Sequence, residues 1–278
     1  MHNFIPHLLL TRVMAFFANS KNKVIKGFLI NAFIFLYRPK LEECLVSDIK
    51  DYPTYNSFFI RKLKKESRPI ENSELTIVSP VDGTIVDHGI VESNMLIQAK
   101  RHQYPVHELV GGKSESAQGA KQYFITIYLA PTDYHRIHCP YGGLISSASH
   151  IGKSLFSVNK KAQENIPHLY IENERAVMKI ENNLLSYSLV SVGASIVGSI
   201  VPFWSDSGAK TRKDYINEWN DGPQEIKKQV LKGQELAHFK MGSTVILIIE
   251  DSSKLDLNSL TTNKTVKFGS KLINLKNI

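Results

Sequence analysis

The sequence predicts an α+β fold with a mainly antiparallel β core and amphipathic helices at the N-terminus. From about residue 75 the chain contains short β-branched or alternating apolar runs, which are typical of strands: 84–86, 123–129, 184–192 and 244–249. Turn-forming glycine and proline separate these runs, at Asp82-Gly83, Gly111-Gly112, Pro140, Gly142-Gly143 and Gly152. The first forty residues instead hold the two most apolar stretches. Helices followed by a series of strands indicate an α+β architecture.

The two apolar stretches at the N-terminus are residues 5–18 and 24–37. Neither reaches the roughly 18 clean apolar residues of a spanning helix, since Arg12 interrupts the first and Lys26 the second. No signal-peptide pattern is evident. Basic residues border the second stretch, namely Lys21, Lys23, Arg38 and Lys40. Composition is equally compatible with helices in the plane of a membrane interface and with helices packed on the core. A single spanning helix is less well supported.

The middle of the chain divides into a helical and a β-rich part. Residues 55–61 suggest a helix, and Pro69 ends that segment. We therefore expect an N-terminal membrane-associating helical region at 1–70 and a β-rich catalytic domain at 71–278. Residues 206–230, rich in charge and amide groups, predict a surface loop followed by a short helix.

Composition limits the function classes. The chain has 278 residues, of which 42% are hydrophobic and 22% charged, as in an ordinary globular protein. Its net charge of +8 suits nucleic acid, anionic lipid or acidic small molecules, but no aromatic-plus-basic stripe supports nucleic acid. Cys44 and Cys139 are the only cysteines, without metal or disulfide spacing, so a reducing compartment is predicted. Cys139 is interpreted as a buried thiol.

Two polar segments contain candidate acid–base groups. Asp82 lies in an Asp-Gly turn, where a lone carboxylate usually supports its own backbone. His135 and His138 follow the strand at 123–129, and imidazole titrates near neutral pH. No further ligand lies at a spacing that completes a metal site, so we predict no bound metal.

A third segment, Gly242-Ser243, directly precedes the apolar strand at 244–249. Composition alone predicts only a turn, and the Gly-x-Ser-x-Gly frame of a nucleophile elbow is absent. A glycine before a serine nevertheless suits a backbone rearrangement. It has no Cβ to block attack on its carbonyl, and it tolerates strained dihedral angles.

Several ordered segments resemble the phosphatidylserine decarboxylase family. Three carry most of the resemblance: Ser79-Pro80-Val81-Asp82-Gly83, Tyr134-His135-Arg136-Ile137-His138 and Met241-Gly242-Ser243-Thr244. Supporting matches are Phe58-Phe59-Ile60-Arg61, Phe156-Ser157-Val158-Asn159, Asn173-Glu174-Arg175, Val192-Gly193-Ala194 and Lys232-Gly233-Gln234-Glu235. Met241 replaces the leucine of the family's Leu-Gly-Ser-Thr motif, a change that conserves volume and polarity. The match runs from about residue 6 to residue 250, so the final segment lies outside it.

The resemblance implies a proenzyme that cuts itself between Gly242 and Ser243. The Ser243 hydroxyl would attack the Gly242 carbonyl and give an ester, with His138 as the base and Asp82 orienting His138 in a serine-protease-like triad. Elimination and hydrolysis would then leave a pyruvoyl cofactor at Ser243 and release ammonia. The pyruvoyl group would act as an electron sink in the decarboxylation of phosphatidylserine to phosphatidylethanolamine.

The resemblance also implies two chains and a substrate pocket. The cut would give a β chain, 1–242, and an α chain, 243–278, which stay together as a heterodimer. His135 would handle a proton or position the substrate carboxylate. The residues expected to line the substrate pocket are Phe156, Ser157 and Asn159.

Because phosphatidylserine stays in the bilayer, the resemblance implies a peripheral protein on the cytoplasmic face of the cell membrane. A basic protein suits this anionic lipid. A homo-oligomer is compatible with the resemblance, and nucleic acid is not expected as a partner. Three rival functions stay open. They are a hydrolase with Ser243 as a free nucleophile, a pyruvoyl decarboxylase of a soluble amino acid, and a non-enzymatic basic lipid-binding module.

Overall fold

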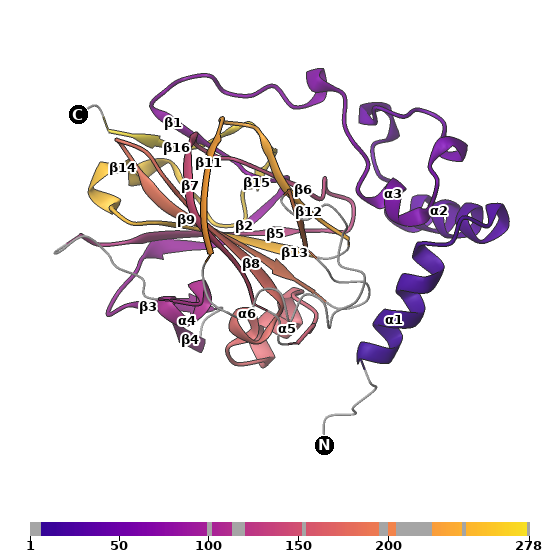
Figure 1. Cartoon of the computed structure of the whole chain (residues 1–278), viewed down its shortest axis with the longest axis horizontal. Helices are drawn as coiled ribbons and strands as arrows, with labels where there is room; N and C mark the ends of the chain where they lie inside the picture. The colour runs from indigo at the N-terminus through magenta and orange to yellow at the C-terminus, as the bar shows by residue number, and fades with distance from the viewer. Residues whose placement is uncertain are drawn as a thin grey trace.

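Two N-terminal helices lead into a body of antiparallel strands, so the predicted α+β fold is confirmed (Figure 1). The computed structural model describes residues 7–98, 102–112, 120–151, 154–194, 200–203, 224–240 and 243–276. The helices are α1 (His7–Ala18), α2 (Lys23–Tyr37), α3 (Tyr55–Phe59), α4 (Val106–Val110), α5 (Lys160–Asn165) and α6 (Leu169–Glu172). The strands are β1 (Thr76–Val78), β2 (Gly83–Ile90), β3 (Met95–Gln98), β4 (His102–Pro105), β5 (Tyr123–Leu129), β6 (Arg136–His138), β7 (Gly143–Ile151), β8 (Arg175–Glu181), β9 (Ser186–Gly193), β10 (Ile200–Pro202), β11 (Gln224–Val230), β12 (Glu235–Phe239), β13 (Ser243–Ile249), β14 (Leu255–Asp256), β15 (Thr265–Val266) and β16 (Lys271–Leu275).

The largest sheet has eight strands in the order β11-β7-β8-β9-β13-β5-β2-β15. Strand β13 lies inside this sheet and pairs along its whole length with β5 on one side and β9 on the other. Its side chains alternate between two hydrophobic clusters. Val245 and Leu247 belong to one cluster, and Ile246 and Ile248 to the other. Because both faces are buried, the strand is a continuous apolar run and does not alternate with polar residues.

Two smaller sheets flank this layer. One has the order β1-β16-β14 and the other β10-β12-β6. The first ties the C-terminal residues to the segment that precedes Asp82. The second carries His138 at the end of β6. The smaller sheets therefore bring the segment before Asp82, the end of β6 and the C-terminal strands to one end of the large sheet.

Helix α2 is defined at both ends by local interactions. The Asn22 side chain accepts hydrogen bonds from the backbone N–H groups of Val24 and Ile25, which caps the first turn. Arg38 adopts a left-handed conformation, with φ of 47°, and ends the helix. One face of α2 packs through Phe33 on the aromatic residues around α3, including Tyr55, Phe58 and Phe59.

Other apolar side chains of the same helices point to solvent. Phe28 is 72% exposed and Phe35 79% exposed, although both lie in α2. The further exposed members of this set are Val13, Phe16, Phe17, Val24 and Leu36. None of the described helices is both long and apolar enough to cross a membrane. The two N-terminal helices thus bury one apolar face and leave a second one exposed.

The sequence-based expectation for residues 206–230 is partly wrong. Residues 204–223 lie outside the described residues, but Gln224–Val230 forms strand β11 and not a short helix. The strand pairs with β7 at the edge of the large sheet. Lys227, Lys228 and Gln229 are exposed there, while Val230 is buried. An edge strand with so many solvated side chains lacks the apolar signal that reveals central strands.

Candidate active site

Ser243 is the first residue of β13 and is fully buried. It lies between Leu129, the last residue of β5, and Gly193, the last residue of β9. The Ser243 Oγ atom has no hydrogen-bond partner in the part of the chain that the structure describes. Gly242, the other half of the predicted cleavage site, lies outside the described residues. A buried hydroxyl that forgoes a hydrogen bond costs about 1–3 kcal/mol, and such a group calls for an explanation, of which a chemical role is one.

His135 lies on the loop that follows β5, shortly after the strand partner of Ser243. It is fully buried, and its ring packs on Phe59 with centroids 4.3 Å apart. The Nδ1 atom is 2.8 Å from the backbone oxygen of Asp133. Since a carbonyl only accepts, Nδ1 carries the proton and Nε2 keeps its lone pair. Burial lowers the pKa of His135 to about 3, so this imidazole is neutral at physiological pH.

The backbone also fixes His135 from the other side. Its carbonyl oxygen accepts a hydrogen bond from the Phe239 N–H at 2.9 Å, just before the connection to Ser243. No hydrogen-bond partner of the His135 Nε2 atom exists among the described residues. The chain before His135 therefore comes from the strand partner of Ser243, and the chain after Phe239 leads to Ser243 itself.

His138 is a second buried, neutral imidazole. Its Nδ1 atom is 2.9 Å from the Gly233 carbonyl oxygen, which fixes the proton on Nδ1. Its Nε2 atom is 3.3 Å from the Tyr134 hydroxyl. Burial lowers the pKa of His138 to about 4. The ring is held flat against Phe268, with centroids 3.6 Å apart and an interplanar angle of 17°.

Asp82 is buried immediately before β2 and accepts several hydrogen bonds. Arg68 donates from Nε to both carboxylate oxygens, at 2.9 and 3.1 Å, and from Nη2 to Oδ2. The backbone N–H of Phe268 donates to Oδ1 at 2.8 Å. The carboxylate is thus held by a distant arginine and a distant amide, and not by the backbone of its own turn.

The structure brings Asp82 and His138 into one cluster, but not into direct contact. The His138 N–H donates to the Pro80 carbonyl at 2.9 Å, which places the two backbones side by side. Among the described contacts, the Asp82 carboxylate bonds to Arg68 and Phe268, while the His138 nitrogens face Gly233 and Tyr134. Phe268 connects the pair through its amide on one side and its ring on the other. Their predicted triad geometry with Ser243 stays a prediction.

The three predicted pocket residues differ in their surroundings. The Asn173 side chain bonds to both backbone groups of Phe156 and donates to the Gly193 carbonyl, which ties Phe156 to the strand partner of Ser243. Asn159 caps helix α5 through a 2.9 Å bond from the Ala162 N–H. Ser157 accepts only a long bond, at 3.4 Å, from the N–H of this capping residue. Phe156 therefore lies nearest the candidate site.

A cavity of about 380 Å³ extends from Asp82 towards the N-terminal helices. Its lining includes Asp133, Tyr134 and a set of basic residues that comprises Arg38, Lys40, Arg61, Arg68 and Lys267. Burial raises the pKa of Asp133 to about 6. Arg61 is only 4% exposed, and its guanidinium donates to backbone carbonyls of Phe59 and Thr132. Glu43 also lines the cavity, so five basic and three acidic residues surround it, and it begins where α2 ends.

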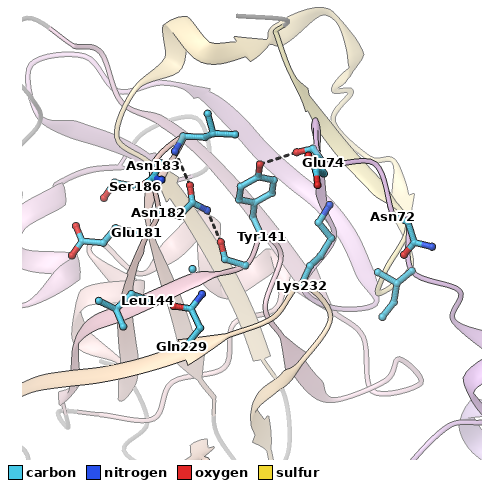
Figure 2. A pocket seen from close by; sticks show the side chains of 14 residues that line it. Asn72, Glu74, Tyr141, Leu144, Glu181, Asn182, Asn183, Ser186, Gln229 and Lys232 are labelled. Atoms are coloured by element: carbon cyan, nitrogen blue, oxygen red, sulfur yellow. Dashed lines mark hydrogen bonds between the residues drawn. The ribbon is translucent and has the colours of Figure 1, made fainter.

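A larger hollow, of about 1040 Å³, is lined by residues around the starts of β7 and β9 (Figure 2). It includes Ser186 at the start of β9, whereas Ser243 pairs with the last residue of that strand. At about 3.3 Å per residue, the two positions are roughly 23 Å apart. Polar side chains of this hollow, such as Tyr141, Asn182 and Lys232, already donate to backbone carbonyls. We attribute these groups to turn structure and not to chemistry.

Sequence reasoning missed two residues of this cluster, Arg68 and Phe268. Arg68 lies before a proline in a charged segment, and nothing in that pattern marks it as the partner of a carboxylate. Phe268 lies in the C-terminal segment that the motifs do not cover. A buried pair formed by His150 and Glu174, with a distance of 3.0 Å, was also missed. The Glu174 carbonyl accepts the Gly193 N–H, so this pair borders the strand beside Ser243.

No group of three or more histidine, cysteine or acidic residues suited to a metal ion occurs among the described residues. Cys44 and Cys139 are free and buried, as interpreted for Cys139 from the sequence. The pyruvoyl group implied by the resemblance requires a serine whose hydroxyl is shielded from water and free to react. Ser243 meets both conditions, since it is fully buried and its Oγ has no described partner.

The described geometry is that of an enzyme with a buried serine and two neutral imidazoles around one end of an antiparallel sheet. A family model described as phosphatidylserine decarboxylase matches residues 55–274, and a model described as PSD matches residues 1–38. The chain belongs to the phosphatidylserine decarboxylase family.

Full-length relatives have the same description. The chain is 38% identical over 267 residues to a phosphatidylserine decarboxylase proenzyme of Vibrio parahaemolyticus, covering 95% of this chain and 93% of the relative. It is 33% identical over 275 residues to the proenzyme of Erwinia tasmaniensis, covering 98% and 92%. It is 38% identical over 249 residues to that of Coxiella burnetii, covering 89% and 87%. The similarity therefore spans both the N-terminal helices and the β body.

Proposed function

We propose that this chain makes its pyruvoyl group from Ser243 and uses it to decarboxylate phosphatidylserine. The activity follows from the family: the chain is a carboxy-lyase of phospholipid biosynthesis that forms phosphatidylethanolamine. The observation that carries the residue assignment is the buried Ser243 hydroxyl, without a described partner, at the start of a central strand. A shielded hydroxyl with no competing hydrogen bond is ready to attack the peptide carbonyl that precedes it.

Self-cleavage begins when Ser243 Oγ bonds to the Gly242 carbonyl carbon and the Gly242–Ser243 C–N bond breaks. The hydroxyl proton passes to a base, and the freed nitrogen takes up a proton, so that an ester replaces the amide. Elimination releases the Gly242 carboxylate and leaves dehydroalanine at the new N-terminus. Water then converts this residue into the pyruvoyl group, and ammonia leaves. The products are the β chain, 1–242, and the α chain, 243–278.

We assign the role of base to His138, with Asp82 held beside it. A neutral imidazole is required for this role, and burial keeps His138 neutral far below physiological pH by lowering its pKa to about 4. Its tautomer is also suitable, since the proton on Nδ1 leaves a lone pair on Nε2, which faces the Tyr134 hydroxyl at 3.3 Å and would accept the serine proton in its place. Arg68 and Phe268 supply the hydrogen bonds that hold the Asp82 carboxylate close to this ring.

In the decarboxylation stage, the pyruvoyl group supplies an electron sink for the loss of carbon dioxide. His135 handles the proton that replaces the carboxylate, because its Nε2 is a buried lone pair without a described partner. Phe156 lies close to the reacting position, as Asn173 ties it to Gly193. Ser157 and Asn159, from the same segment, line the outer part of the substrate pocket.

The exposed apolar side chains of α1 and α2 bring the site to its lipid substrate. Phe28 and Phe35 enter the acyl boundary, while basic residues near the ends of α2, such as Lys23 and Arg38, meet anionic headgroups. Residues 1–70 are thus a membrane-associating region, and residues 71–278 form the catalytic domain. The protein is peripheral and faces the membrane from the cytoplasm.

The decisive experiment compares two buried serines whose hydroxyls both lack a described partner. Ser243→Ala should leave a single uncut polypeptide without decarboxylase activity, as measured by intact mass and by carbon dioxide release. Ser191→Ala on the neighbouring strand removes an equally buried hydroxyl and serves as the control. It should still yield two chains, the smaller one blocked at its N-terminus. Normal processing of Ser243→Ala would refute the assignment.

A further inference from the structure

The C-terminal segment at residues 267–270 covers the candidate processing residues. Phe268 is 7% exposed, and its backbone N–H donates to the Asp82 carboxylate at 2.8 Å. Its ring lies parallel to the His138 ring, with centroids 3.6 Å apart. It also packs near Tyr134, whose hydroxyl faces the His138 Nε2 atom. One residue therefore contacts both groups to which we assign the activation of Ser243.

Strands on both sides hold Phe268 in place. Before it, β15 pairs with β2, so that Val266 lies opposite Gly83, the neighbour of Asp82. After it, β16 pairs with β1. Between these strands, the Gly269 N–H donates to the Ser79 carbonyl, and the Ser79 N–H donates to the Ser270 carbonyl. The tail can therefore place Phe268 only after it has paired with strands on both sides.

The turn itself requires glycine at position 269. Its φ of +81° is a conformation that other residues rarely adopt. A Cβ atom there would also lie 2.9 Å from the Pro69 carbonyl oxygen. This tight turn presses the tail against the segment that contains Arg68, the other partner of Asp82. Both hydrogen-bonding partners of the carboxylate are thus fixed by one local arrangement.

We infer that Phe268 is a positioning residue for self-cleavage, so that the precursor cuts itself only after its C-terminal tail has docked. This inference rests on the proposed roles of Asp82, His138 and Ser243. The amide of Phe268 fixes the carboxylate, and its ring fixes the plane of the imidazole and excludes water from one face. Misplacement of catalytic groups by about 1 Å can cost on the order of 100-fold in rate.

The inference also predicts the stage of folding at which the Gly242–Ser243 bond is cut. Synthesis proceeds from the N-terminus, so Ser243 and its base are made before Phe268. A cut at that stage would separate an α chain whose strands had not yet formed. If the reaction must wait for the tail, the bond breaks only when β14, β15 and β16 already hold the α chain to the body.

The first test measures the cleavage rate of full-length precursors refolded from denaturant, with small-chain formation followed by mass spectrometry. Phe268→Leu keeps the amide and an apolar side chain but loses the flat ring, and we expect cleavage to slow about tenfold or more. Phe268→Tyr keeps the ring and should restore the rate. Leu272→Ala weakens the packing of the same tail without touching Asp82 or His138, and serves as the control for stability. It should cut faster than Phe268→Leu at an equal or lower Tm.

The second test follows full-length chains held on the ribosome by C-terminal linkers of two lengths. The short linker keeps residues 265–275 inside the exit tunnel, whereas the long linker exposes them. We expect cleavage only with the long linker. Equal cleavage with both linkers, or a wild-type rate for Phe268→Leu, overturns the inference. If Ser243→Ala is still processed, the proposed function itself fails, so the two failures are distinguishable.

Discussion

At the scale of single residues, the candidate site contains two histidines that burial keeps uncharged. His135 and His138 each place Nδ1 against a backbone carbonyl, which sets the same tautomer in both. Burial lowers their pKa values to about 3 and about 4, well below the ordinary value near 6.5. Each ring therefore presents a basic nitrogen in surroundings from which water is largely excluded. A charged imidazole could not accept the proton of a serine hydroxyl.

These lowered pKa values predict that stability falls in acid. Between pH 6.5 and 4, His138 binds a proton in the unfolded chain but not in the folded chain. The free energy of unfolding therefore decreases as the pH falls. The slope is on the order of 1.4 kcal/mol per pH unit for one such group. His138→Gln should remove about that much of the slope, measured by urea denaturation of the uncut Ser243→Ala precursor at pH 7 and pH 5.

An exposed histidine provides the comparison. His107→Gln on α4 replaces an exposed histidine outside the candidate site and serves as the matched control. If His138→Gln and His107→Gln give the same slope as the parent, the neutral state of the buried imidazole is wrong.

At the scale of elements, the sequence predicts strands well where burial dictates their composition. The strand at 123–129 has the same bounds in the structure, because β5 is a central strand with most of its side chains buried. The strand at 244–249 begins one residue earlier, at Ser243, and its run of branched apolar residues reflects two buried faces. Edge strand β11 was missed because its exposed lysines resemble a surface segment.

Local motifs in the sequence point to only part of the candidate site. Asp82, His138 and Ser243 lie in recognisable segments, and the structure places the first two together. Phe268 reaches the site only through tertiary pairing of β15 and β16 with the body, and Arg68 through its side-chain contact with Asp82, and no local pattern predicts either. The long-range part of an active site is fixed by topology, which a single sequence does not display.

Helix α2 leads to a prediction about membrane binding. Phe28 and Phe35 are exposed, whereas Phe33 faces the core, so the two outward side chains can change without loss of packing. A phenylalanine that enters an apolar phase contributes about 1.5–3 kcal/mol. The double variant Phe28→Ser and Phe35→Ser should therefore bind phosphatidylglycerol vesicles at least about tenfold more weakly in cosedimentation, with an unchanged Tm.

The control for this experiment is Leu231→Ser, which removes a similarly exposed apolar side chain from outside the N-terminal helices. Its vesicle binding should match that of the parent. Unchanged binding by the double variant would leave the interfacial surface without support.

At the scale of the whole molecule, one arginine joins the N-terminal region to the catalytic body. Arg68 Nη2 contacts Glu43 Oε2 at 2.8 Å, and the same guanidinium holds the carboxylate of Asp82. All three side chains are largely buried. The pKa of Glu43 is lowered because the hydrogen bond and charge of Arg68 outweigh the effect of burial, which alone would raise it. Residues 1–70, for which we propose membrane association, and Asp82 thus share one ionic cluster.

Breaking this cluster should destabilise the whole chain. Arg68→Met leaves the Asp82 carboxylate without its cation and leaves Glu43 with Lys267 alone, at 3.7 Å, and removal of one partner of a buried ion pair costs about 3–5 kcal/mol. Urea denaturation of the uncut Ser243→Ala precursor measures the loss. Lys65→Met removes an exposed cation from the same segment and should change stability by less than about 0.5 kcal/mol. Equal stabilities of the two variants would show that the cluster contributes little.

The position of β13 between β5 and β9 also decides how the mature enzyme can be assembled. Strand β13 is hydrogen-bonded on both edges, so the small subunit that we propose to begin at Ser243 cannot leave without opening the sheet down the middle. Each small subunit therefore stays paired with the large subunit from the same translation product. Exchange of small subunits between assembled molecules therefore requires this sheet to open.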